Sequence, residues 1–164
     1  MNRALERPVD FQSDSTRRRY KSAARKVVRS LLFVDEPELT GPVCGTATFS
    51  RDFMTRGPFD SQKRSLRQLN LEQRLFEWPC SFLIYSDAFQ ALPSGVHRRV
   101  EAELYRILSG HDQTETYAHL SPDQRADIRA ILKATTKLRL DHHPQTGEIQ
   151  QEIPAAGAGR SSSR

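Results

Sequence analysis

Residues 78–93 read WPCSFLIYSDAFQALP and form the most apolar run of the chain. Proline lies near each end of the run, at Pro79 and Pro93. Proline ends or kinks a helix because it lacks a backbone N–H and its ring clashes with the preceding turn. We therefore predict a proline-bounded helix over residues 80–92, packed at the centre of a small domain.

Three further segments show the three- and four-residue apolar spacing of amphipathic helices. The first covers residues 16–33, where Asp14 or Ser15 can cap the first turn. The second covers residues 94–109, and a glycine follows it. The third begins in residues 120–137, LSPDQRADIRAILKATTK, which combine a serine cap, a proline in the first turn and a glutamine at the capping-box position.

Between the predicted helices over residues 16–33 and 80–92, the apolar spacing of a helix is weaker. Asn70 and Gln73 resemble a capping box and predict a short helix over residues 70–78. Residues 34–61 contain several prolines and glycines and are interpreted as a connection. This connection is long for a loop without structure, so we expect either a short helix near TFSRDFM, residues 48–54, or a wrap over the core by its aromatic side chains.

The chain is predicted to be all-α, a small irregular bundle of about five helices with disordered termini. No segment alternates apolar and polar residues as a half-buried strand does. Apolar residues make up 37 % of the 164 residues, below the ~45–50 % that is usual for a globular domain. We assign residues 1–14 to a flexible tail, 15–140 to one helical domain and 141–164 to a disordered tail rich in glycine, proline, serine and glutamine.

Positive charge is concentrated at the N-terminal end. Residues 1–33 carry nine Lys/Arg and three Asp/Glu, a balance of +6, whereas residues 34–164 carry sixteen and seventeen. The predicted helix over residues 16–32 holds the cations of a candidate nucleic-acid site. These are Arg17, Arg18, Arg19, Lys21, Arg25, Lys26 and Arg29. Such a face suits phosphates or an anionic membrane, but it lacks the interleaved aromatic residues of a base-stacking surface.

A thiol-dependent enzyme is a second alternative. Cys80 would lie at the start of the predicted helix, where the helix dipole lowers the pKa of a thiol. His97 could act as its base, and Asp87 could orient that histidine. Cysteine is more often a buried packing residue. If Asp87 is buried, it needs a partner such as Arg64, with Arg67 and Arg74 as the other arginines in reach.

No metal or cofactor site is predicted. His111 and His119 flank Asp112 and Glu115 in one loop, but this is not a known metal-ligand spacing. We interpret the loop histidines, and the pair at residues 142–143, as solvent-exposed. The chain contains no P-loop, dinucleotide-binding glycine pattern, nucleophile-elbow motif or H-E-x-x-H motif.

The sequence favours a cytoplasmic protein with reduced thiols. Cys44 and Cys80 are the two cysteines and do not form a C-x-x-C motif. The N-terminus lacks the apolar core of a signal peptide. No run approaches the ~20 apolar residues of a transmembrane helix.

The segments SLRQLNLEQRLF (residues 65–76), WPCSFLIYSDAFQALP (78–93) and AHLSPDQRADIRAILKATT (118–136) carry a resemblance. Over residues 31–136 the chain resembles the C-terminal region of larger bacterial proteins that have no assigned activity. This resemblance implies that the chain is a detached C-terminal domain of a longer architecture, and that some relatives are exported. It supplies no catalytic residue.

Together these features favour a non-catalytic helical module with a structural or interaction role. We expect its partner to be another protein or domain, and we expect no enzyme activity and no cofactor. Nucleic-acid binding through the helix over residues 16–32 is the first alternative, and thiol chemistry at Cys80 is the second.

Overall fold

The computed structural model describes residues 13–45 and 48–141. Within these residues the chain contains five α-helices and two 3₁₀ turns, and its one β-type pairing is an isolated bridge. The predicted all-α class is therefore confirmed. The predicted tails, residues 1–14 and 141–164, lie almost entirely outside the described residues.

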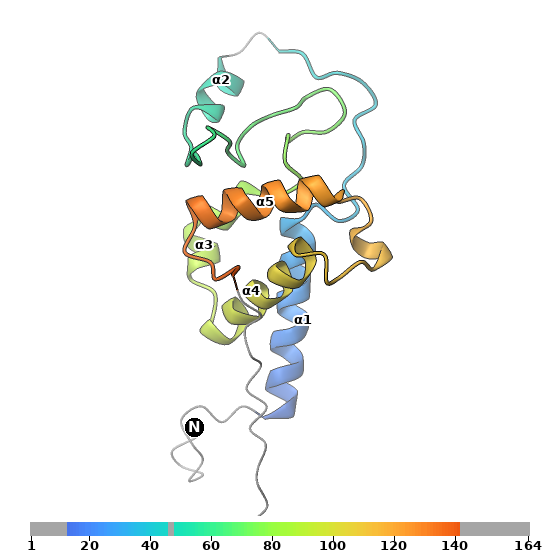
Figure 1. Cartoon of the computed structure of the whole chain (residues 1–164), viewed down its shortest axis with the longest axis vertical. Helices are drawn as coiled ribbons and strands as arrows, with labels where there is room; N and C mark the ends of the chain where they lie inside the picture. The colour runs from blue at the N-terminus through green and yellow to red at the C-terminus, as the bar shows by residue number, and fades with distance from the viewer. Residues whose placement is uncertain (1–12, 46–47, 142–164) are drawn as a thin grey trace, which may run out of the picture.

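The helices form a body with an irregular segment at one end (Figure 1). In chain order the elements are α1 (Asp14–Leu31), α2 (Phe49–Met54), η2 (Phe82–Tyr85), α3 (Asp87–Gln90), α4 (Ser94–Leu108), η3 (Glu115–Tyr117) and α5 (Pro122–Thr135). The first turns of α1 extend beyond the other helices, and α2 lies at the opposite end of the molecule (Figure 1). We call residues 34–78, which include α2, the cap. No helix in the described part of the chain is long and apolar enough to cross a membrane.

The helix starts follow the sequence signals closely. Ser121 and Gln124 form the predicted capping box at the start of α5, with hydrogen bonds of 3.2 Å and 3.0 Å between each side chain and the other's backbone N–H. At α1 the N-cap residue is Ser13, whose hydroxyl accepts from the N–H of Thr16 at 3.3 Å. This N-cap residue lies one position before Asp14, the nearer of the two predicted residues.

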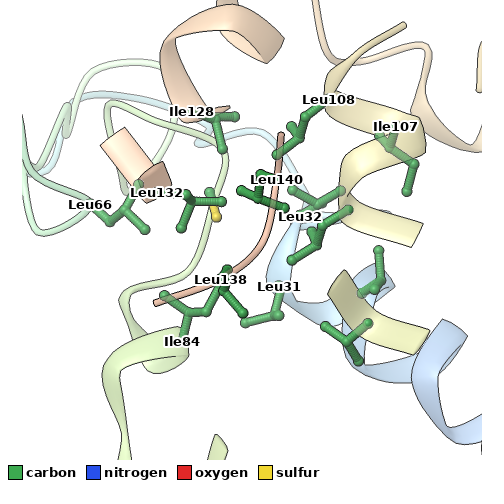
Figure 2. Packing of buried hydrophobic residues seen from close by; sticks show 14 of the residues in the cluster. Leu31, Leu32, Leu66, Ile84, Ile107, Leu108, Ile128, Leu132, Leu138 and Leu140 are labelled. Atoms are coloured by element: carbon green, nitrogen blue, oxygen red, sulfur yellow. The ribbon is translucent and has the colours of Figure 1, made fainter. Parts of the chain in front are cut away.

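The core is made where α1 packs on α4 and α4 packs on α5. Its fully buried residues include Val28 and Leu104. Leu138 and Leu140, which follow α5, return into this core beside Leu31 and Leu32 at the end of α1 (Figure 2). Arg129 holds that return in place, because its Nε and Nη2 both donate to the carbonyl of Leu140, at 3.1 and 2.9 Å.

The predicted helix over residues 80–92 is wrong as a continuous helix. The chain instead forms the short elements η2 and α3, separated by Ser86 in an extended conformation with ψ of 152°. The hydroxyls of Ser81 and Ser86 each accept a backbone N–H at the start of the next element, from Leu83 and from Phe89. Serine competes with the helix for backbone partners in this way. The central position is confirmed, since Cys80, Ile84 and Phe89 belong to the core.

The predicted helix over residues 70–78 is also wrong. The Oδ1 of Asn70 accepts the N–H groups two and three residues later, and Leu71 takes a positive φ of 61°. The chain then turns back, so that Leu69 and Phe76 form an antiparallel bridge. An asparagine side chain can cap a helix or close a turn with the same hydrogen bonds, and here it closes a turn.

Arg125 joins α5 to the loop after α4. It is 8 % exposed, and its guanidinium donates to the carbonyls of Ile107, Asp112, Tyr117 and Leu120 at 2.6, 2.8, 2.7 and 3.1 Å. The first of these carbonyls belongs to the last turn of α4, where the helix dipole favours a cation. One buried side chain therefore fixes η3, its loop and the end of α4 together.

Candidate functional site

The structure does not bring the proposed thiol site together. Cys80 is fully buried, and burial raises the pKa of its thiol to about 12. His97 contacts the ring of Phe89 and lies 3.9 Å from Glu101. Asp87 is exposed in the first turn of α3. The thiol is thus protonated at neutral pH and shielded from solvent, and the other two candidates have different neighbours.

Arg64, the first arginine considered as a partner of Asp87, is paired with other carboxylates. Arg64 Nε donates to Asp60 at 2.7 Å, and Arg64 Nη1 donates to Asp127 of α5. Burial of Asp60 opposes ionisation, but the backbone N–H groups of Arg64 and Gln62 and the Arg64 guanidinium outweigh it and lower the pKa of this carboxyl. This ion-pair network attaches the cap to α5.

The loop histidines lie in separate surroundings. His111 stacks on Tyr105 with ring centroids 5.7 Å apart, and the Nε2 of His119 lies 2.9 Å from the carbonyl oxygen of Leu32. Within residues 13–45 and 48–141, no group of three or more His, Cys, Asp or Glu side chains is placed to hold a metal ion. The histidines at residues 142–143 lie outside the described residues.

The cations of α1 face solvent. All seven are exposed except Arg29, which is half-buried and binds Asp35 at 2.5 Å. Arg17 has a long, exposed ion pair of 3.9 Å with Asp14. The other five have no carboxylate partner among the described residues. They are Arg18, Arg19, Lys21, Arg25 and Lys26.

Four of the seven cations form a stripe beside the packed face of the helix. Arg18, Lys21, Arg25 and Arg29 follow one another at steps of three and four residues, which places them on one side of α1 over roughly 16 Å. Val28 and its apolar neighbours are buried in the core. The apolar face of α1 is therefore not available to a bilayer, and its exposed face offers charge without apolar anchors.

A cluster of five phenylalanines joins the cap to the body. Phe53 of α2 lies edge-on to Phe82 of η2 at 5.1 Å and also contacts Phe76, which stacks on Phe33 at 5.5 Å. At the outer end, Phe49 stacks on Phe53 at 5.7 Å and is 63 % exposed. We call these five residues the aromatic cluster. It reaches from the core to the surface and leaves its last ring largely uncovered.

Arg67 lies against this cluster. Its guanidinium carbon is 4.6 Å from the ring centre of Phe82 and 5.1 Å from that of Phe53. Its Nε donates to the carbonyl of Gly57 at 2.9 Å. The sequence offered one clue to this site, the aromatic residues of a connection expected to wrap over the core. It gave no sign of the arginine, because the contacting rings come from distant segments.

Two clefts of the described residues are bordered mainly by residues outside the aromatic cluster, although Phe33 borders the first. One, of about 850 Å³, lies between the start of the cap and η3 and is bordered by five carboxylates and by Arg29 and Arg74. The other, of about 1030 Å³, runs along α5 and is bordered by small residues such as Ala126, with Arg129 and Lys133. These cations already have partners, since Arg129 binds Leu140 and Lys133 binds Asp141.

No family model, curated protein or solved structure matches this chain.

Proposed function

We propose that this chain is a non-catalytic helical interaction module that binds another protein or domain through the aromatic cluster. The observation that carries the proposal is the 63 % exposed ring of Phe49 at the end of a chain of packed rings. Large exposed apolar groups backed by a rigid support are typical of protein-binding surfaces. The buried, protonated thiol of Cys80 supports a non-catalytic role.

The charge around this surface indicates the kind of partner. Residues 51–67 contain five Lys/Arg and two Asp/Glu, and one of those carboxylates, Asp60, is already bound to Arg64. A partner segment that combines apolar and acidic side chains is complementary to such a surface. If the resemblance to the C-terminal region of larger bacterial proteins holds, that partner is a domain of the same architecture.

The proposal is tested by comparing the wild-type protein with Phe49→Ser and with the control Lys137→Gln. Lys137 is exposed and lies outside the basic segment of residues 51–67. A partner is first captured from cells and then purified, and its affinity for each variant is measured by calorimetry. We expect Phe49→Ser to weaken binding at least roughly tenfold, as for the central aromatic anchor of an interface, and Lys137→Gln to change it little. Equal affinity of the wild type and Phe49→Ser overturns the proposal.

Nucleic-acid binding through α1 is the second candidate function. It is supported by the five exposed cations that have no carboxylate partner in the described part of the chain. A gel-shift titration across salt tests it, because phosphate contacts release counterions and make affinity fall steeply with salt. Replacing the five by glutamine should abolish binding, whereas the same change at five other exposed cations should not. The changed residues are Arg18, Arg19, Lys21, Arg25 and Lys26, and the control residues are Arg51, Arg56, Lys63, Lys137 and Arg139. Binding that is absent at low salt, or insensitive to salt, removes this candidate.

A further inference from the structure

The guanidinium of Arg67 is held in a fixed orientation. The rings of Phe53 and Phe82 lie 5.1 and 4.6 Å from its central carbon, and its Nε is bound to the carbonyl of Gly57. Contacts with aromatic faces and a hydrogen bond to a backbone carbonyl remove most of the rotational freedom of an arginine side chain. Little entropy is then lost when a ligand binds to it.

The remaining donors of Arg67 have no partner in the described structure. Arginine carries five N–H donors, and only the one on Nε has an acceptor among the described residues. Ser109 Oγ is the one buried side-chain nitrogen or oxygen of those residues that lacks a hydrogen bond. The terminal nitrogens of Arg67, which also lack one, are therefore not completely buried.

The surroundings favour an anion that carries an apolar group. No carboxylate of the described residues lies within ion-pair distance of Arg67, whereas Asp60 and Asp127 both bind Arg64. The exposed ring of Phe49 stacks on Phe53, which is one of the two rings in contact with the guanidinium. The free fork of an arginine matches the two oxygens of a carboxylate, and the neighbouring phenyl surface matches an apolar substituent.

We infer that Arg67, with Phe53, Phe82 and the exposed Phe49, forms a binding site for a carboxylate attached to an apolar group. The carboxylate belongs to an apolar segment of a partner protein, as a side chain or a C-terminus, or to a small free acid. This inference rests on the proposed function for the surface and adds the chemistry by which that surface recognises its partner.

The test is an NMR titration of the full chain that follows the Nε–Hε signal of Arg67 and the ring signals of Phe49. The probes are an acetylated Gly-Leu-Phe peptide with a free C-terminal carboxylate, the same peptide as its amide, 3-phenylpropionate and phenyl phosphate. We expect saturable shifts with the free peptide and none with the amide. A response to 3-phenylpropionate as strong as that to the peptide indicates a small-acid site, and a stronger response to the peptide indicates a protein segment.

Two variants and one control separate binding from folding. Arg67→Lys keeps the charge but loses the bidentate geometry, and we expect affinity to fall by roughly tenfold or more, which corresponds to the loss of a hydrogen bond between charged groups. Phe49→Ser alters an exposed ring and should weaken binding while leaving the fold intact. Arg51→Lys is the matched control and should bind like the wild type.

The inference is overturned if the amide shifts the same signals as the free acid, if Arg67→Lys binds as well as the wild type, or if phenyl phosphate binds more tightly than the carboxylates. In these cases the proposed function survives if a purified partner still requires Phe49. Conversely, if the carboxylate binds at Arg67 but no partner requires Phe49, the site stands and the proposed function falls.

Discussion

Replacing Arg125 by methionine removes four hydrogen bonds to backbone carbonyls from a side chain that is 8 % exposed. Hydrogen bonds from a charged donor contribute about 1.5–3 kcal/mol each, so the four together would contribute ~6–12 kcal/mol. Burying a guanidinium costs several kcal/mol and offsets part of this gain. We therefore expect Arg125→Met to lower the free energy of unfolding by about 3–5 kcal/mol, a large share of the ~5–15 kcal/mol typical of a domain.

Urea unfolding followed by circular dichroism measures this loss, with Arg139→Met as the control. Arg139 is exposed, and its replacement should change stability by less than about 0.5 kcal/mol. Hydrogen exchange gives a second readout, because residues 109–121 should lose protection before α1 does once their carbonyls lose the guanidinium. If Arg125→Met and Arg139→Met lose equal stability, or if exchange in residues 109–121 is unchanged, the assigned role of Arg125 is refuted.

Three further outcomes follow from buried groups. Only Cys44, which is exposed, should react with a thiol reagent in the native protein near neutral pH, and Cys80 should react only after unfolding; rapid reaction of both thiols would contradict its burial. The lowered pKa of Asp60 gives stability that is present above the unfolded-state value and is lost as pH falls through the folded-state value. Acid titration of stability should therefore be flatter in Asp60→Asn than in the wild type, and equally steep curves would exclude the effect. Leu140→Ala should cost about 2–5 kcal/mol in thermal or urea unfolding, since this residue is fully buried, and a loss below about 1 kcal/mol would mean that the return after α5 is not part of the core.

The sequence predicted the elements whose signals are local. The N-cap residue of α5 is the predicted Ser121, and that of α1 lies one residue before the predicted Asp14. The apolar spacing of residues 94–109 correctly predicted α4. The failures at residues 70–78 and 80–92 share one cause. Asparagine and serine side chains bind backbone N–H groups equally well in a turn and at a helix start, so the local sequence does not distinguish the two outcomes. Contacts from distant segments decide between them.

The two structural arginines differ in how far they could be foreseen. Arg125 precedes Ile128 and Leu132 at steps of three and four residues, so the spacing already placed a cation on the buried face of α5. The carbonyls that satisfy it could not be identified, because three of them lie outside any predicted helix. Arg67 lay in a segment without periodicity, and the rings that contact it are 14 and 15 residues away.

The body is stabilised by one kind of contact, and the cap is attached to it by another. This difference bears on where a partner can bind. The body rests on aliphatic side chains that are completely buried, such as Val28 and Leu104. The cap contributes Leu66 to that core (Figure 2). It is also attached through the buried rings of Phe53 and Phe76 in the aromatic cluster, the ion pairs of Arg64 and the ring contacts of Arg67. Buried rings and ion pairs therefore hold the aromatic cluster against the body. The exposed ring of Phe49 at its outer end lies where a partner can reach it without any change in the packing of α1, α4 and α5.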